Sequence, residues 1–384
     1  MTGLRWDQAD EPRPQQTLFD EPVFERQPGR GEYRGIEFLH VRAQRVVNEV
    51  RGAPFGFRYT INAYRGCTHA CTYCFARPTH TYLDLDADRD FERRIVVKVN
   101  AASQLRSELD PRRWRGELIA MGTNTDPYQR AEGKYRLTRS IIEVFAEVAN
   151  PFSILTKSTL VLRDVPLLAE AARRTSVRVN LSIGTLDEDV WRATEPGTPH
   201  PLRRVRAVEQ LNAAGIPCGV LIAPVLPGLS DAPEQLDDVV AACVDAGAQS
   251  ISTVLLHLRP GVKDVFYARL GETHPHLLAD YRRRYRDRAY APKADQQALD
   301  TLVRGLVRDH GGVAANRADP EHMTGRAPGA PGGDGDGPGD GRRDGAGAAA
   351  AAGATVAVRR RAGAARPGAG ASPADPAGAQ LSLL

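Results

Sequence analysis

The chain has 384 residues, 42% of them hydrophobic, and a formal net charge of +4 at pH 7. This length allows one large domain or two ordinary ones with tails, and the small net charge excludes a polycation. Five cysteines, no apolar leader and no run of about 18 apolar residues exclude a secreted disulfide scaffold and a transmembrane protein, so we expect a cytoplasmic protein.

The two ends of the chain differ in composition from its middle. Residues 1–35 are polar and rich in Pro, Gln and Arg, which predicts a poorly ordered segment. Residues 318–384 are rich in Ala, Gly and Pro and have little to bury, which predicts a disordered tail. We therefore expect one ordered core over 36–312, which ends in a helical extension.

Within that core, apolar β-branched runs alternate with amphipathic stretches. The expected strands are 58–63, 117–122, 152–156, 177–183, 218–224 and 251–256, and the expected helices are 101–109, 138–148, 165–174, 203–214 and 234–246. Runs such as CGVLIAP are apolar throughout, as in strands buried on both faces of a parallel sheet. The repeated alternation predicts an α/β fold, either a barrel or a doubly wound sheet. Polar residues follow the strands, where α/β barrels place their chemistry.

Three cysteines lie within eight residues just after the first expected strand. Cys67, Cys71 and Cys74 are spaced C-x3-C-x2-C, and three thiolates can hold three irons of a cubane cluster while the fourth iron stays open. A zinc site with His69 as the fourth ligand is the alternative. Structural zinc sites usually take a second ligand pair well downstream. Cys218 and Cys243 stand alone in apparent core elements, so the iron–sulfur interpretation is favoured.

The cysteine motif, with an aromatic Tyr73 before its third cysteine, resembles the signature of radical S-adenosylmethionine (SAM) enzymes. The segments TINAYRGCTHACTYCFARPTH, GTNTDPYQ, ILTKS and IAPVLPGLSD resemble the branch related to spore photoproduct lyase, over about residues 35–310. The resemblance implies a partial (β/α)6 TIM-type barrel, a [4Fe–4S] cluster ligated by the three cysteines, and SAM. It also implies reductive cleavage of SAM to a 5′-deoxyadenosyl radical, which takes a hydrogen atom from a substrate.

The resemblance further implies contacts with SAM. Tyr73 would lie near the adenine, and Thr123 and Asn124 offer oxygen acceptors for the methionine ammonium. Ser182 fits a ribose or carboxylate contact. For Thr123 and Ser182, ordinary turn chemistry at a strand end is an equal alternative.

Basic and acidic residues near the same strand ends extend this set. Lys157 and Arg203 are candidates for the SAM carboxylate, where a cation forms a charge-assisted hydrogen bond. For Arg203, a solvated arginine at a helix start is the alternative. Asp126 either contacts SAM or caps the segment that follows it.

Two departures from the family pattern matter. Ala63 stands where the motif usually has proline, which should loosen a turn without removing a ligand. Spore photoproduct lyases carry a hydrogen-donor cysteine after the second strand, where this chain reads Thr123-Asn124-Thr125. Thymine-dimer repair is therefore not implied, and no catalytic hydrogen donor can be assigned.

Three further features remain open. His257 and Arg259 follow the sixth expected strand and would face the barrel mouth, and the turn-rich loop 195–199 could cover SAM. The segment 281–288 interleaves arginine with tyrosine, which fits either nucleic-acid binding or a surface helix with its aromatic side chains turned inward.

The sequence thus predicts a monomeric radical SAM enzyme, reduced by a flavodoxin or ferredoxin type of donor. Its substrate is unidentified, with a nucleic-acid base or nucleotide favoured by the resemblance. The alternative is a noncatalytic zinc module that binds nucleic acid. Such a module has no use for polar loops at successive strand ends, so the enzyme is favoured.

Overall fold

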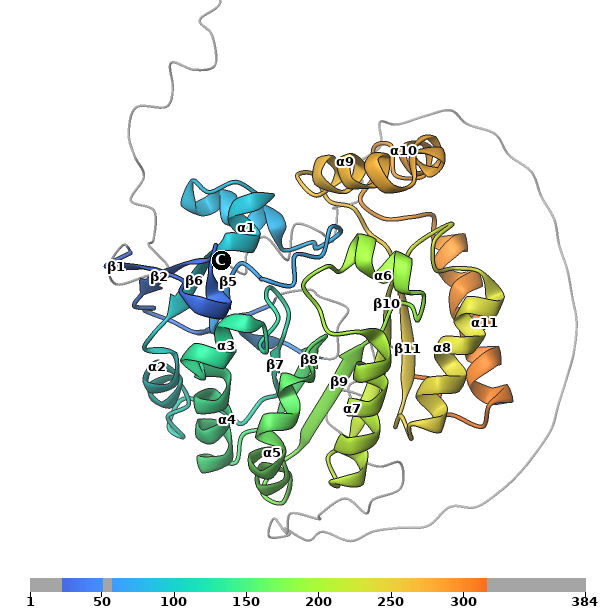
Figure 1. Ribbon diagram of the computed structural model, residues 1–384. Helices are drawn as coiled ribbons and strands as arrows, with labels where there is room; N and C mark the ends of the chain where they lie inside the picture. The colour runs from blue at the N-terminus through green and yellow to red at the C-terminus, as the bar shows by residue number, and fades with distance from the viewer. Residues whose placement is uncertain (1–22, 51–56, 316–384) are drawn as a thin grey trace, which may run out of the picture.

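A seven-stranded sheet forms the centre of the computed structural model, which describes residues 23–50 and 57–315 (Figure 1). Its strand order is β11-β10-β9-β8-β7-β4-β3. Six strands run parallel and follow one another in chain order, and β3 pairs antiparallel with β4 at the edge. The strands are β3 (Val47–Glu49), β4 (Tyr59–Ile61), β7 (Ile119–Met121), β8 (Phe152–Thr156), β9 (Val177–Ser182), β10 (Cys218–Val225) and β11 (Ile251–Leu255).

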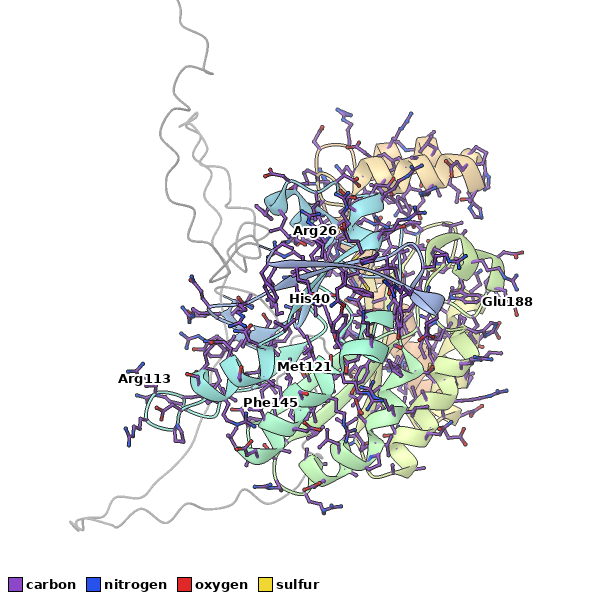
Figure 2. All side chains as sticks on the ribbon, turned by 60° about the vertical axis from the view of Figure 1, so that its left-hand side comes forward. Arg26, His40, Arg113, Met121, Phe145 and Glu188 are labelled. Atoms are coloured by element: carbon purple, nitrogen blue, oxygen red, sulfur yellow. The ribbon has the colours of Figure 1, made fainter. Side chains whose placement is uncertain are left out.

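Helices pack on the outside of this sheet (Figure 1). Helix α4 shows why: its buried side chains recur at helical spacing, and Phe145 stacks on Phe152 of β8 with 5.0 Å between ring centroids. Figure 2 labels Phe145 and Met121, which are buried, and Glu188, which is exposed. The α-helices are α1 (Arg89–Arg93), α2 (Ala101–Glu108), α3 (Arg130–Tyr135), α4 (Leu137–Glu147), α5 (Val165–Ala172), α6 (Glu188–Thr194), α7 (Pro201–Ala213), α8 (Pro233–Asp245), α9 (Lys263–Thr273), α10 (Leu278–Arg284) and α11 (Lys293–Asp309). The 3₁₀ helices are η1 (Gly31–Tyr33), η2 (Arg77–Leu83), η3 (Thr159–Asp164) and η4 (Pro275–Leu277).

A second sheet has four strands, and one of them, β5, ends just before the first cysteine. Its order is β1-β2-β6-β5, with β1 (Glu25–Pro28), β2 (Glu37–Val41), β6 (Arg94–Lys98) and β5 (Tyr64–Arg65). Strand β1 falls within the segment 1–35 that we expected to be poorly ordered, and this part of the prediction is wrong. The strand is mostly exposed and gains its order by antiparallel pairing with β2, which local composition does not reveal.

The parallel α/β fold is confirmed, and each expected strand and helix has its counterpart. The strand order is the one that a partial (β/α)6 barrel uses. The expected disorder of residues 1–22 and 318–384 lies outside the described residues, so the division into domains stays a prediction. Among the helices of the described ranges, none has the length and apolarity needed to cross a membrane.

Candidate functional site

A cavity of about 290 Å³ opens at the carboxyl ends of the parallel strands. All three predicted cysteine ligands line it: Cys67, Cys71 and Cys74. The predicted SAM contacts Tyr73, Thr123, Asn124, Lys157 and Ser182 line it as well. Parallel strands end at a common edge, so residues separated by more than a hundred positions meet there. Arg203, the remaining predicted contact, is exposed on α7 and does not line the cavity.

The cysteine loop, residues 66–74, is held by hydrogen bonds from several elements. The Cys67 N–H donates to the Phe91 carbonyl over 2.9 Å, and the Gly66 carbonyl accepts from Thr125 and Gln129 at 2.7 and 2.9 Å. Gly66 has a φ of 80°, and a Cβ there would lie 2.8 Å from the Phe91 carbonyl oxygen. A glycine is therefore required where the chain turns into the loop.

The three thiols are free and lie at the cavity in positions shielded from water. Cys67 and Cys71 are buried, and Cys74 is partly buried. Burial raises the pKa of all three thiols. A bound cation reverses this effect, because a thiol that coordinates a metal is deprotonated outright. The donor set therefore suits a metal centre.

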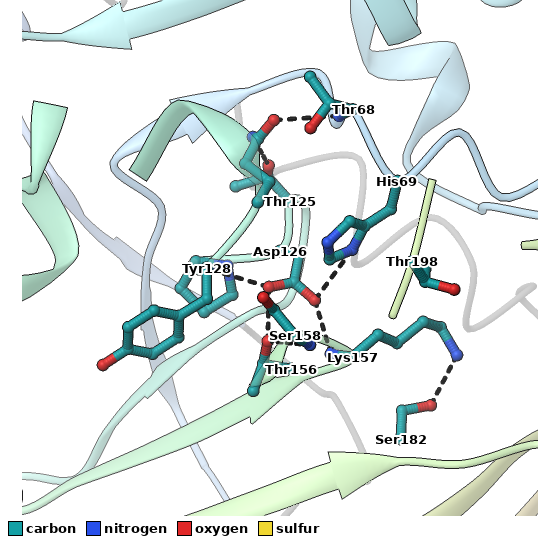
Figure 3. A network of polar contacts seen from close by, with 12 residues as sticks. Thr68, His69, Thr125, Asp126, Tyr128, Thr156, Lys157, Ser158, Ser182 and Thr198 are labelled. Atoms are coloured by element: carbon teal, nitrogen blue, oxygen red, sulfur yellow. Dashed lines mark hydrogen bonds and ion pairs between the residues drawn. The ribbon is translucent and has the colours of Figure 1, made fainter. Parts of the chain in front are cut away.

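The geometry does not favour the zinc alternative. Within the described residues, no three His, Cys, Asp or Glu side chains form a group that could hold a single metal ion. His69, the proposed fourth zinc ligand, instead places Nδ1 3.3 Å from Oδ2 of the Asp126 carboxylate (Figure 3). A cubane cluster spreads three cysteines over three irons, so its ligands need not converge on one point.

Asp126 is a carboxylate whose side chain is only 9% exposed, and it ties two strand ends to the cysteine loop (Figure 3). It accepts hydrogen bonds from the Thr156 hydroxyl at 2.6 Å and from the backbone N–H of Lys157 at 2.7 Å and of Tyr128 at 2.9 Å. Burial opposes its ionisation, but His69 and these donors outweigh burial and lower the pKa of Asp126. The structure shows the capping role of Asp126, which also lines the cavity, so its contact with SAM stays a prediction.

Lys157 points along the cavity wall from the end of β8. Its Nζ lies 2.8 Å from Ser182 Oγ, 2.9 Å from Glu195 Oε1 and 3.0 Å from the Ala223 carbonyl oxygen. Figure 3 shows the contact with Ser182. An ammonium has three N–H donors, and all three are used here.

Glu195 is the buried centre of this arrangement. Its carboxylate pairs with Lys157, lies 2.5 Å from the Arg204 guanidinium and accepts a hydrogen bond from the Tyr73 hydroxyl. Burial opposes ionisation, but Arg204 and Lys157 outweigh it and hold the pKa of Glu195 well below its usual range. Burial and the neighbouring carboxylate raise the pKa of Tyr73. We call Tyr73, Lys157, Ser182, Glu195 and Arg204 the cavity network.

The sequence analysis proposed Arg203 as a SAM contact, but the buried arginine is its neighbour, Arg204. Arg203 is exposed, whereas Arg204 is fully buried and also donates to the Ser182 carbonyl over 3.0 Å. The signal was present: Arg204 is in helical phase with the apolar residues Ala207, Val208 and Leu211, and all four are buried. Glu195 carried no such signal, because its partners come from three other parts of the chain.

Thr123 and Asn124 border the cavity on the side of β7. The Asn124 N–H donates to Asn62 Oδ1 over 3.1 Å, and Thr123 Oγ1 accepts from the Asn62 amide over 3.2 Å. Gly122, just before them, has a φ of 93°, and a Cβ there would lie 2.0 Å from the Leu155 carbonyl oxygen. This close approach brings the turn after β7 against β8.

The loop 195–199 is docked on the cysteine loop. The Gly197 N–H donates to the His69 carbonyl over 3.0 Å, and a Cβ at Gly197 would lie 2.2 Å from the Thr68 carbonyl oxygen. The structure thus places Glu195 by packing its loop against the cysteines. At the other rim, His257 lines the cavity, as expected for a residue that follows β11, whereas Arg259 is not among the lining residues.

Two other expectations are settled by burial. Cys218 and Cys243 are fully buried in the main hydrophobic core, which confirms them as packing residues. In the segment 281–288, Tyr281 and Tyr285 are buried beneath α10 and its C-terminal end, so they cannot stack on bases. The inward-turned surface helix is the alternative that the structure shows.

Comparisons with known proteins give one family model and several relatives. The model of the Radical SAM superfamily matches residues 61–240. An uncharacterized protein of Mycobacterium tuberculosis is 44% identical over 290 residues, which cover 75% of this chain and 85% of the relative. An uncharacterized protein of Methanocaldococcus jannaschii is 32% identical over 196 residues, which cover 51% of this chain and 70% of the relative.

Solved structures of spore photoproduct lyase share the fold. One, complexed with dinucleoside spore photoproduct, has a TM-score of 0.54 at 17% identity and covers 72% of this chain and 81% of that chain. A mutant with bound AdoMet and the same dinucleoside has a TM-score of 0.52 at 18% identity and covers 75% and 85%. At this identity the likeness establishes the fold alone.

Proposed function

Because this chain belongs to the radical SAM superfamily and is a radical SAM enzyme, we propose that Cys67, Cys71 and Cys74 hold a [4Fe–4S] cluster and that SAM binds beside it in the cavity. The observation that carries the proposal is the convergence of three free thiols and five polar contacts on one cavity at the strand ends. The cluster and SAM together supply, when bound, reductive cleavage of SAM to methionine and a 5′-deoxyadenosyl radical that takes hydrogen from the substrate.

The residues of the chain would bind and orient SAM. The oxygens of Thr123 and Asn124 are acceptors suited to the methionine ammonium. Tyr73 is fixed by its hydrogen bond to Glu195 and offers its ring to the adenine. The docked loop 195–199 packs beside the cysteines and helps to exclude water from them.

Lys157 can bind the SAM carboxylate only by exchange, because its three donors are already used. Releasing Glu195 would leave a buried carboxylate with one cation fewer, which is costly. Ser182 and the Ala223 carbonyl are neutral acceptors, so giving up either costs less. We propose that Lys157 keeps Glu195 and exchanges a neutral partner for the carboxylate. Arg203 has no part in this arrangement.

For the substrate, we propose a nucleic-acid base or nucleotide. The shared fold of lyase structures that hold a dinucleoside supports this class. The dimer-repair reaction itself is not proposed, because Cys218 and Cys243 are buried away from the cavity. We further propose a monomeric, cytoplasmic enzyme reduced by a flavodoxin or ferredoxin type of donor.

Anaerobic reconstitution with iron and sulfide tests the cluster ligands. We expect stoichiometric iron and a charge-transfer absorption in the wild type, both lost in Cys67→Ala, Cys71→Ala and Cys74→Ala. The matched control is Cys243→Ala, whose thiol is equally buried but lies in the core. Equal iron in all four variants would reject the assignment.

A further inference from the structure

The floor of the cavity, on the side of the amino-terminal halves of the strands, is polar. The side chains of β9 alternate: Val177, Val179 and Leu181 join the hydrophobic core, whereas Asn180 and Ser182 line the cavity. By the same alternation Arg178 lies on this side of β9. It does not itself line the cavity, but it donates hydrogen bonds to Asn180 and Ser250, which do. Ser153 of β8, Ser252 of β11 and Ser250, just before β11, also line the cavity.

Arg178 is a buried cation without an acidic partner. It is 4% exposed, and its guanidinium donates to Ser250 Oγ and, over 3.5 Å, to Asn180 Oδ1. No carboxylate of residues 23–50 or 57–315 forms an ion pair with it. A guanidinium has five N–H donors, so three find no partner among the described residues. Burial accordingly lowers the pKa of Arg178 from its usual value.

Two fully buried arginines are neutralised, whereas Arg65, also buried, donates to the Thr79 carbonyl and has no carboxylate partner among the described residues. Arg77 is fully buried and pairs with Glu92, and Arg204 is fully buried and pairs with Glu195. An isolated buried charge is expensive, and proteins usually pair it. Arg178 departs from this rule as Arg65 does, but its partners Asn180 and Ser250 line the cavity.

A glycine keeps space around the guanidinium. A Cβ at Gly219 of β10 would lie 2.7 Å from Asn180 Oδ1, 2.8 Å from Arg178 Nη2 and 2.8 Å from Ser250 Oγ. Any side chain at Gly219 would push these three groups apart. Two side chains of β9 and the residue just before β11 thus meet over one glycine of β10, and this arrangement does not depend on the charge of Arg178.

We infer that Arg178 binds an anionic group of the substrate, a carboxylate or a phosphate, at the floor of the cavity. The inference rests on the proposed function and narrows its substrate to a small anionic molecule. The planar guanidinium matches both anions in a bidentate manner, and Ser250 and Asn180 hold it in place. Arg178 and Ser182 are four residues apart on β9, about 13 Å at the rise of a strand. A molecule of nucleotide size spans that length, with its anionic group at Arg178 and its opposite end near the cysteine loop.

Anion binding to the full-length, reconstituted protein tests the site directly. Thermal unfolding and calorimetric titration would be measured anaerobically with sodium phosphate, with sodium acetate and with sodium chloride at equal ionic strength. We expect phosphate or acetate to raise the melting temperature above the chloride value. In Arg178→Met we expect that increment to vanish and the affinity to fall about tenfold or more. Arg206→Met, an exposed arginine of α7, is the matched control and should behave as wild type.

The two anions distinguish the substrate chemistry. Preference for phosphate indicates a phosphate ester, and preference for acetate indicates a carboxylate. Gly219→Ala keeps the charge but fills the space, so it should weaken binding even if Arg178→Met is unstable. Equal stabilisation of wild type and Arg178→Met by phosphate and acetate, or none beyond chloride, would overturn the inference.

The outcomes separate this inference from the proposed function. If the wild type forms 5′-deoxyadenosine but binds neither anion specifically, only the Arg178 site is refuted. If it binds an anion through Arg178 but neither holds a cluster nor cleaves SAM, the site stands and the proposed function fails.

Discussion

The described residues hold two polar networks of similar composition, each centred on a buried glutamate. The cavity network centres on Glu195, and a second one centres on Glu132, which pairs with Arg163 at 2.8 Å and accepts a hydrogen bond from Tyr64 at 2.5 Å. Arg163 also pairs with Asp164 at 2.8 Å, as does Arg139. We call Tyr64, Glu132, Arg139, Arg163 and Asp164 the scaffold network.

The networks differ in what they connect. The scaffold network joins β5, α3, α4 and η3, and none of its members lines the cavity. The cavity network joins the ends of β8 and β9 to α7 and the cysteine loop, and Tyr73, Lys157 and Ser182 line the cavity. Burial and charge pairing therefore do not mark the site by themselves. Contact with the cavity does, and mutations should separate stability from chemistry accordingly.

The largest effect is expected in the scaffold network. Glu132→Gln leaves Arg163 with one carboxylate fewer and should lower the free energy of unfolding by about 3–5 kcal/mol. The rate of 5′-deoxyadenosine formation per folded, cluster-bearing molecule should stay within about twofold of wild type. Denaturant unfolding and chromatography measure the two quantities. Glu170→Gln, exposed on α5, is the control, and a selective loss of activity in Glu132→Gln would break the comparison.

The cavity network should show the opposite balance. Glu195→Gln removes the charge that holds Lys157 and Arg204, and the Tyr73 hydroxyl loses an ionised acceptor. We expect 5′-deoxyadenosine formation per cluster to fall about tenfold or more, because a hydrogen bond to a charged group contributes about 1.5–3 kcal/mol. The exposed Glu188→Gln of α6 serves as the control. Unchanged turnover in Glu195→Gln would mean that this network only supports the fold.

The pH dependence of stability sharpens the account of the scaffold. Burial opposes ionisation of Asp164, but hydrogen bonds from Arg163 and Arg139 outweigh it and lower its pKa. A carboxyl whose pKa is lower in the folded state stabilises the fold above its unfolded pKa, near 4, and loses that contribution as the pH falls.

As the pH falls from about 5 to about 3, the free energy of unfolding should therefore decrease less in Asp164→Asn than in the wild type. The difference is at most about 1.4 kcal/mol for each unit by which the pKa of Asp164 is lower in the folded than in the unfolded state. Circular dichroism across that range measures it. Asp189→Asn, whose side chain is 93% exposed, should keep the wild-type slope. An unchanged slope in Asp164→Asn would show that its pairing does not stabilise the folded state.

The smallest effect separates two neighbouring arginines. Arg203→Met is expected to change neither the free energy of unfolding by more than about 0.5 kcal/mol nor the affinity for SAM, because Arg203 is exposed. Arg204→Met leaves Glu195 with Lys157 as its one remaining cation in the cavity network and should affect both. Weakened SAM binding in Arg203→Met would restore the role that the sequence first suggested for it.

The same contrast explains what the sequence could reveal. The six parallel strands were predictable because each is a locally apolar run, and the residues at their ends were predictable because such ends share one edge. β1 and β5 were not, since each has four residues or fewer and forms by pairing with another strand, β2 or β6. Arg204 was missed because the sequence analysis chose Arg203, one position earlier, which lies off the buried face of α7. Glu195 was beyond reach, because its role depends on Tyr73, Lys157 and Arg204, which only folding brings together.

The central claim is most directly tested by product analysis. The anaerobically reconstituted protein would be reduced with dithionite, supplied with SAM and assayed for 5′-deoxyadenosine, with Cys71→Ala and Cys243→Ala in parallel. We predict 5′-deoxyadenosine from the wild type and Cys243→Ala and none from Cys71→Ala. Intact SAM with every protein, despite a bound cluster in the wild type, would contradict the account.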